Sequence, residues 1–222
     1  PRRYRNRDFV WWLGALGKSD LEAMAPGTEH VTVAFSGANG GNTVDFRRFA
    51  EAGCTLVGRT DSYADGTLCF ADDLVENIAA GDAFYHRMLD ECDAYAEANG
   101  LDLPLDPEAR KIGPDPDCLT HPVESLDLAE AGITTVLWAT GFARDYDWLE
   151  IDTFDAQGAP LHQRGVSREQ GVYFLGLPWQ SRRGSSFIWG VWHDAKHVAD
   201  HIATQRAYLD FHETAQAQTE PA

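Results

Sequence analysis

Three histidines in the stretch WGVWHDAKHVADH stand at a spacing that could bind a metal ion. His193, His197 and His201 are four residues apart, so a helix would place all three on one face. The segment HDAKH differs from the zinc-binding motif H-E-x-x-H by one carboxylate, an aspartate where the motif has its glutamate base. Asp194 is shorter than glutamate, so its reach to a zinc-bound water would differ. His193 and His201 would lie roughly 12 Å apart on a straight helix, too far for one ion.

The apolar residues of the same stretch favour a structural helix over a metal site. Val191, Ala195, Val198 and Ile202 recur at helical spacing, as expected of a helix face that docks on a sheet. An aspartate near the start of a helix is also stabilised by the helix dipole. We therefore predict no metal ligand here, with a metal-dependent hydrolase as an alternative.

Glycines that follow two apolar runs are a second feature that could do chemistry. ITTVLWATGF contains Ala139–Gly141, and GVYFLGLPW ends in Gly176–Trp179, after which QSRRGSS leads to the last helix. In open α/β sheets, ligands bind beyond the carboxyl ends of strands, where glycine lets the backbone approach closely. A helix N-terminus adds free N–H groups for an anionic or carbonyl-bearing ligand. On spacing alone, tight turns without a ligand explain these motifs equally well.

The elements that would position these motifs alternate between strands and helices. Apolar and β-branched runs predict strands at His30–Phe35, Cys54–Arg59 and Gly66–Ala71, and in the two runs above. Helical spacing and terminal glycines predict helices within 43–53, 71–99 and 187–211. This order predicts an α/β fold with a largely parallel sheet and a helical insertion.

Composition restricts the class of protein further. The 222 residues carry a formal charge of −17, which argues against a nucleic acid or an anionic membrane as partner. No apolar run reaches the length of a transmembrane helix. Four scattered cysteines without a C-x-x-C pair, and no visible signal peptide, predict reduced thiols in a cytoplasmic protein. The opening PRRYRNRDFVWWL, which lacks a methionine, leads us to expect a piece of a longer chain.

Five motifs occur in an order that is more specific than any one of them. They are RYRNRD, SGANGGNTVDFRRFAEAGCTLVGR, LWATGF, GVYFLGLPW with RRGSS, and WGVWHDAKHVADHI. Together they resemble the C-terminal half of a family of FAD-dependent oxidoreductases, often labelled flavoproteins of potassium transport. That family is related to the flavin-containing and Baeyer–Villiger monooxygenases. The resemblance extends from Arg3 to about Ile202, and it implies a monooxygenase-like enzyme that uses FAD and NADPH on a small-molecule substrate.

The resemblance also implies an incomplete Rossmann-like flavoprotein with two dinucleotide-binding domains. Residues 1–139 would be the remainder of the NADPH-binding domain, with the helical insertion and a linker at about 101–118. Residues 140–212 would close the FAD-binding domain, and 213–222 would be a frayed tail. The sequence has no G-x-G-x-x-G, the turn that grips pyrophosphate in such domains. We therefore expect the missing N-terminal half of the same protein to be a partner, and this chain alone to be inactive.

By the same resemblance, two groups of residues would contact the cofactors. The backbone of Thr140 and Gly141, in the return motif, would lie near both cofactors. The backbone around the flavin would come from the loop after the second run and the start of the last helix: Gly176, Leu177, Pro178, Trp179, Gly190 and Val191. Arg2 and Arg3 would face the 2′-phosphate of NADPH, because guanidinium suits that group; a solvated basic turn explains them equally well. The cofactors would carry the chemistry, so no catalytic side chain is named. A non-catalytic α/β binding module is a further alternative.

Overall fold

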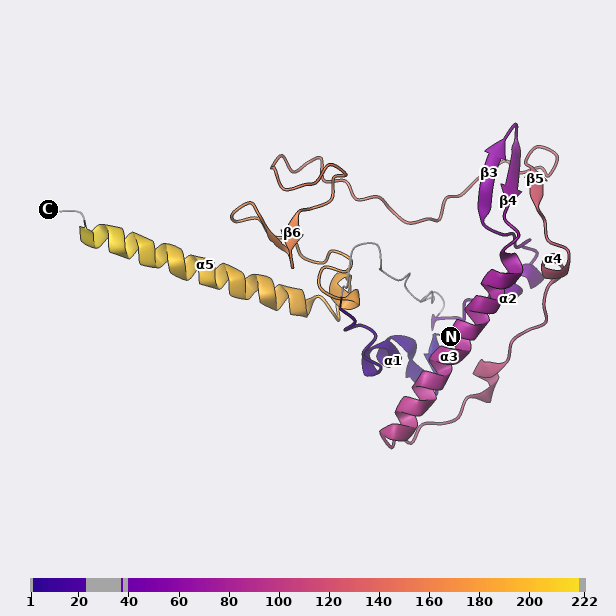
Figure 1. The fold of residues 1–222 in the computed structure, drawn as a ribbon. Coiled ribbons are helices and arrows are strands. Elements are labelled where there is room, and N and C mark those ends of the chain that lie inside the picture. The colour runs from indigo at the N-terminus through magenta and orange to yellow at the C-terminus, as the bar shows by residue number, and fades with distance from the viewer. Residues whose placement is uncertain (1, 23–36, 38–39, 220–222) are drawn as a thin grey trace. The chain divides into compact units, whose positions relative to one another are not determined.

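The computed structural model describes residues 2–22, 37 and 40–219, and Figure 1 labels its elements. These residues belong to two compact units. The first contains the described residues up to Leu16 and those from 37 to Gly141, and the second contains 17–22 and those from Phe142 onward. The strand predicted at His30–Phe35 lies outside the described residues.

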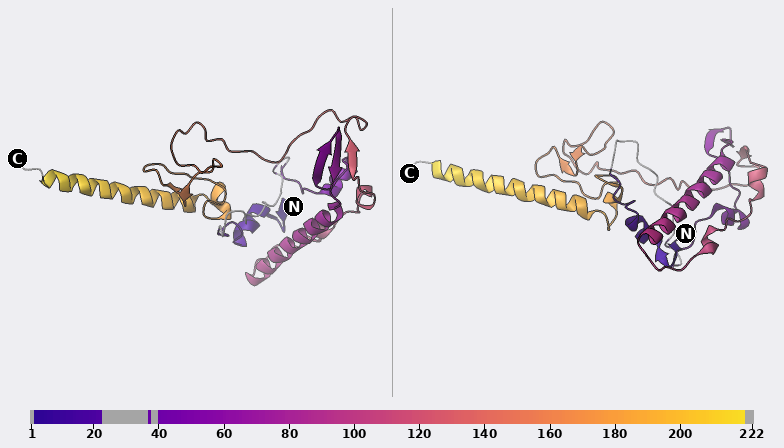
Figure 2. Two further views of the ribbon diagram at one scale, coloured as in Figure 1. Left: turned by 45° about the horizontal axis from the view of Figure 1, so that its top comes forward. Right: turned by 60° about the horizontal axis from the view of Figure 1, so that its bottom comes forward.

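The first unit is built on a long helix, α3 (Leu74–Ala98), and the helix predicted within 71–99 is confirmed. Gly81 does not interrupt α3, and Gly100, with φ +61, follows its C-terminal end as such glycines commonly do. Helix α1 (Phe9–Ala15) lies beside α3 in Figures 1 and 2. The core between them consists of Tyr4, Phe9, Trp12 and Leu13 with Met88, Leu89, Cys92 and Ala96.

Ion pairs hold the segment after α3 against that helix. Asp93 of α3 accepts hydrogen bonds from the Tyr4 hydroxyl (2.9 Å), Arg5 (3.1 Å) and Arg110 (2.6 Å). Burial opposes ionisation of Asp93, but hydrogen bonds from Arg110 and Tyr4 outweigh it and lower the pKa of this carboxyl. Arg110 belongs to the short helix η2 (Pro107–Arg110). The predicted linker at 101–118 is therefore tied to α3.

A buried arginine connects a second helix of this unit to α3. Arg47 lies in α2 (Phe46–Glu51), the helix predicted within 43–53. Its guanidinium pairs with Asp82 of α3 (2.8 Å) and with Asp115 (2.7 Å), which lies before the short helix α4 (Asp117–Thr120). A buried charge needs such partners, because water no longer solvates it.

All paired strands in the described part of the chain are short and antiparallel. Their connections include three two-residue turns, Arg5–Asn6, Asp65–Gly66 and Arg164–Gly165, in which every residue has positive φ. That geometry is typical of type I′ hairpins. The strands form a three-stranded sheet of β3 (Thr60–Ala64), β4 (Thr67–Phe70) and β5 (Ser125–Asp127), and the hairpins β1 (Arg3–Tyr4) with β2 (Arg7–Asp8) and β6 (His162–Gln163) with β7 (Val166–Ser167).

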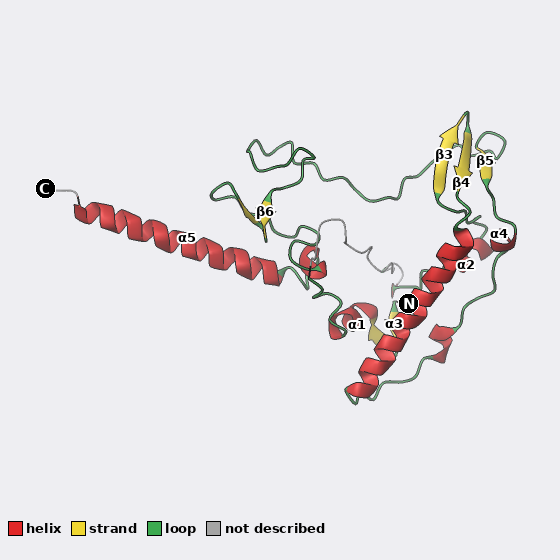
Figure 3. Ribbon diagram, in the orientation of Figure 1, coloured by secondary structure: helices red, strands yellow, loops and turns green. Residues whose placement is uncertain are grey.

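The prediction of a largely parallel, Rossmann-like sheet is wrong. Of the described segments predicted as strands, Gly66–Ala71 contains β4, whereas Cys54–Arg59 and the run ITTVLWATGF have no ladder. GVYFLGLPW contributes an isolated bridge from Tyr173 to Val166. Figure 3 shows the chain between β5 and β6 as loop. Apolar β-branched residues indicate a tendency toward sheets, but a strand also needs a neighbouring backbone to pair with.

The second unit contains the helix that carries the three histidines. This helix, α5 (Trp192–Thr219), begins after the short helix η3 (Arg183–Ser186) and lies in the region where the sequence predicts a last helix. None of the helices in the described ranges combines the length and the apolar character needed to span a membrane.

Candidate functional site

The loop Gly176–Trp179 has an unusual backbone that is held in place by one buried glutamine. Gly176 has φ +83 and Trp179 has φ +55. Gln180 accepts a hydrogen bond from the Leu177 N–H (3.2 Å) and donates one to the carbonyl of Phe174 (3.0 Å). Within the described residues, the N–H groups of Gly176 and Trp179 have no acceptor. The loop therefore presents two backbone N–H groups that could donate hydrogen bonds to the carbonyl oxygens of a ligand.

Gly190 lies in a close backbone contact that explains its residue type without a ligand. A Cβ at Gly190 would stand 2.3 Å from the carbonyl oxygen of Gly184, nearer than atoms can approach. Gly184 is itself fixed, because its N–H donates to the Ser19 carbonyl (2.8 Å). The N–H groups of Gly190 and Val191 both donate to the carbonyl of Phe187 (2.9 Å each). These two residues, predicted to contact the flavin, therefore already use their backbone donors.

Apolar side chains flank both motifs and are open to solvent. Leu175 before the Gly176 loop is 52% exposed, and Ile188 and Trp189 before Gly190 are 91% and 43% exposed. The rings of Phe187 and Trp189 stack with centroids 4.7 Å apart. Large apolar side chains that group together on a protein surface commonly mark a binding site. These side chains group along the chain at the two motifs, as expected of such a surface.

His193, His197 and His201 of α5 do not converge on one point. His193 faces Asp20, with 3.4 Å between Nε2 and the carboxylate, and its ring stacks on Trp192. His197 and His201 instead line a pocket beside the β6–β7 hairpin. Among the residues that the structure describes, no group of three His, Cys, Asp or Glu side chains is arranged to hold a metal ion.

Asp194 of the HDAKH segment is a buried carboxylate in the first turn of α5. Among the residues that the structure describes, neither of its oxygens has a hydrogen-bond partner. Its negative charge favours the protonated form of His162 in the β6–β7 hairpin, but burial of His162 is the larger effect and lowers the pKa of that imidazole. The helix dipole at the start of α5 favours a carboxylate at this position.

The remaining predicted site residues belong to the first unit. Thr140 and Gly141 are exposed, Gly141 has φ +96, and no atom would touch a Cβ added to it. Arg2 forms an ion pair with Asp8 (2.9 Å) and packs along Gly41, whereas Arg3 is exposed on β1. Arg2 is therefore engaged within the unit.

Part of this chain is similar to proteins that are named as oxidoreductases. A stretch of 94 residues, 41% of this chain, is 46% identical to an "Uncharacterized oxidoreductase CzcO-like" of Geobacillus kaustophilus and covers 27% of that protein. Stretches of 73 residues are 42% and 41% identical to proteins named "Uncharacterized oxidoreductase CzcO" from Bacillus velezensis and Bacillus subtilis. Each of these covers 32% of this chain and 21% of the relative.

The chain thus matches about a quarter of the length of these curated relatives. No protein-family model matches the chain, and no solved structure matches it. The names of the relatives support the general class of oxidoreductases. The ordered motifs imply this class, together with a more specific activity that the names do not mention.

Proposed function

We propose that this chain is the C-terminal part of a monooxygenase-like oxidoreductase that uses FAD and NADPH on a small-molecule substrate. Support comes from the ordered motifs, from the oxidoreductase names of three similar proteins, and from the loop Gly176–Trp179. The observation that carries the proposal is the pair of N–H donors at Gly176 and Trp179, which have no acceptor among the described residues and lie beside exposed apolar side chains.

The residues of the second unit suit the ring end of FAD better than its diphosphate. An isoalloxazine ring is flat and apolar, with carbonyl oxygens at its edge, so it would match Leu175, Trp189 and the two free donors. The diphosphate of a dinucleotide requires a glycine-rich turn that opens onto a helix, and the sequence contains no G-x-G-x-x-G. A grip on the diphosphate would therefore come from another segment. Bound FAD would supply the redox chemistry, taking electrons from NADPH.

The role that we assign to this chain is to bind and shield the ring. The Gly176 and Trp179 N–H groups would hold the ring carbonyls, and Leu175, Ile188 and Trp189 would exclude water from one side of the ring. Under this proposal residues 1–139, with Arg2 and Arg3, serve NADPH. Residues 140–212 serve FAD, with Thr140 and Gly141 near both cofactors.

A pair of glycine variants tests this assignment in the protein encoded by the complete reading frame. Gly176 and Gly171 share φ +83, and a Cβ at either would meet no atom within 4 Å. Gly176→Ala and Gly171→Ala therefore carry the same backbone strain of about 1–3 kcal/mol. We expect Gly176→Ala to lose flavin absorbance and Gly171→Ala to retain it at equal folded content. Equal flavin content in both variants would contradict the role of the loop.

A further inference from the structure

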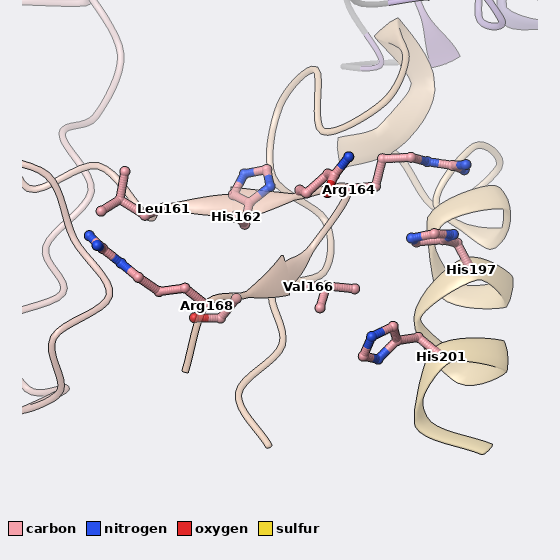
Figure 4. A pocket seen from close by; sticks show the side chains of 9 residues that line it. Leu161, His162, Arg164, Val166, Arg168, His197 and His201 are labelled. Carbon is pink, nitrogen blue, oxygen red and sulfur yellow. The ribbon is translucent and has the colours of Figure 1, made fainter. Parts of the chain in front are cut away.

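An open pocket of about 550 Å³ lies between the β6–β7 hairpin and α5, wholly within the second unit. Figure 4 shows Arg164 extending from the hairpin turn toward α5, beside His197, with His201 one turn further along the helix. Arg168 lies on the other side of the hairpin in this view. The residues that line the pocket are Leu161, His162, Gln163, Arg164, Val166, Ser167, Arg168, His197 and His201.

The backbone of the turn that carries Arg164 is fixed, although the Arg164 side chain is exposed. Gly165, the next residue, is buried so closely that a Cβ would stand 2.3 Å from both the Gln180 amide nitrogen and the Phe174 carbonyl. The same Cβ would be 3.2 Å from Val198 of α5. The Phe174 N–H donates to the Gly165 carbonyl (2.7 Å), and the Gly165 N–H donates to Nδ1 of His162 (3.2 Å). The backbone of the turn at Gly165 is therefore packed against α5, next to Arg164.

The pocket concentrates basic groups in a strongly acidic chain. The formal charge of the chain is −17, yet two arginines and three histidines line this pocket and no aspartate or glutamate does. In the described ranges, neither Arg164 nor Arg168 has a carboxylate within ion-pair distance. Asp194 of α5, which acts electrostatically on His162, is fully buried and does not line the pocket.

One imidazole of this pocket carries a polar atom that is still unsatisfied. Nδ1 of His201 is buried and has no hydrogen-bond partner in the described part of the chain. The His201 ring packs edge-on against Tyr173 with centroids 5.7 Å apart. Because Nδ1 is closed to solvent, a group bound in the open pocket would meet the exposed remainder of the His201 ring, which lines the pocket. Such a group must accept hydrogen bonds from a guanidinium and from imidazole N–H groups at the same time.

We infer that this pocket binds a phosphate group, held by the Arg164 guanidinium and the imidazoles of His197 and His201. A phosphate offers several acceptor oxygens around one centre, and the planar fork of arginine binds two of them. The phosphate could be a free anion or part of a dinucleotide, since both present the same oxygens. The inference does not rest on the proposed function, because none of the residues of the flavin loop lines this pocket.

Calorimetric titration of the 222-residue chain with inorganic phosphate, at ionic strength matched with chloride, tests this site. We expect saturable binding of one phosphate per chain. Arg164→Asn should weaken it at least about tenfold, because it removes the charged fork, while asparagine tolerates the positive φ of 50° at this position. His197→Gln tests the site from α5 without touching the turn, and it should also weaken binding. Arg206→Gln, on α5 but outside the pocket, is the matched control and should bind as the wild type does.

Competition with NADP⁺ distinguishes the two sources of phosphate. Displacement of inorganic phosphate by NADP⁺ in the wild type, lost in Arg164→Asn, assigns the pocket to a dinucleotide phosphate. Retention of phosphate at saturating NADP⁺ assigns it to a free anion. Absence of saturable phosphate binding by the wild-type chain, or unchanged affinity in folded Arg164→Asn and His197→Gln, would overturn the inference.

Discussion

Replacing Gly190 by alanine should destabilise the second unit strongly. The new Cβ would stand 2.3, 2.6 and 2.7 Å from the carbonyl oxygen, carbonyl carbon and Cα of Gly184. Ordinary contact begins at 3.4 Å, so the two backbones must separate by about 1 Å. Gly184 cannot move freely, because its N–H donates to Ser19 (2.8 Å) and its carbonyl accepts from Phe187 (2.9 Å).

The expected cost follows from those contacts. Overpacking a close contact costs about 1–3 kcal/mol, and a lost backbone hydrogen bond adds about 1 kcal/mol, so the total is about 2–4 kcal/mol. For a domain of about 60–100 residues, each kcal/mol lowers the melting temperature by about 4–8 °C, so a fall of at least about 8 °C is expected.

Urea denaturation followed by tryptophan fluorescence measures this effect, because Trp189 and Trp192 lie beside the substitution. Gly81→Ala is the control of opposite sign. Gly81 lies inside α3 with no atom within 4 Å of an added Cβ, so alanine there should stabilise by about 0.5–1 kcal/mol. A Gly190→Ala protein as stable as the wild type would refute the close contact between Gly190 and Gly184.

Three further predictions concern the first unit and the histidine helix. Trp12→Ala should cost about 3–5 kcal/mol in chemical denaturation, because Trp12 is fully buried; a loss of less than about 1 kcal/mol would contradict the core between α1 and α3. Asp93→Asn should cost about 1–2 kcal/mol at neutral pH, a figure reduced for partial exposure. The folded-state pKa of Asp93 is lowered, so the stability difference between wild type and variant should be present above the unfolded-state pKa of about 3.9. It should disappear as the pH falls through the folded-state pKa. A stability difference that persists in acid would count against the ion pairs. Mass spectrometry of the native chain should find no stoichiometric zinc, and His193→Gln should leave the metal content unchanged; bound zinc lost in this variant would restore the metal-site reading of HDAKH.

The sequence predicts the long helices well because their signal is local. In α3, the spacing of Leu74, Met88, Leu89 and Cys92 places them on a buried face, and all four are buried. The helix within 43–53 also forms, with Asp45 as its N-cap and Gly53 after its end. Capping and periodicity depend on neighbours within a few residues, so they can be read without knowing the rest of the fold.

The parallel sheet could not be predicted reliably from the same sequence. Val136, Leu137 and Trp138 look like the middle of a buried strand, yet they are 53%, 87% and 74% exposed. Strand formation depends on a partner that is distant in the sequence, and an apolar run shows only that a partner would be favourable. In contrast, Asp65–Gly66 is a short-range hairpin signal that would have located β3 beside β4.

The candidate sites show the same division between local and distant information. Positive φ at Gly176 explains why a glycine stands at the start of GLPW. The contact of Gly190 with Gly184, and the meeting of Arg164 with the histidines of α5, depend on how separate segments pack. His193 and His197 share a helical spacing in the sequence, whereas the structure directs His193 toward Asp20 and His197 toward the hairpin pocket.

The flavin content of two purified proteins tests the central proposal most directly. One protein is this 222-residue chain, and the other is the product of the complete reading frame that contains it. We predict that the chain alone purifies without stoichiometric flavin, because it has no turn that grips the diphosphate, and that the complete product carries one FAD and oxidises NADPH. A complete product that binds no FAD and does not oxidise NADPH would contradict the assignment of this chain to a flavin-dependent oxidoreductase.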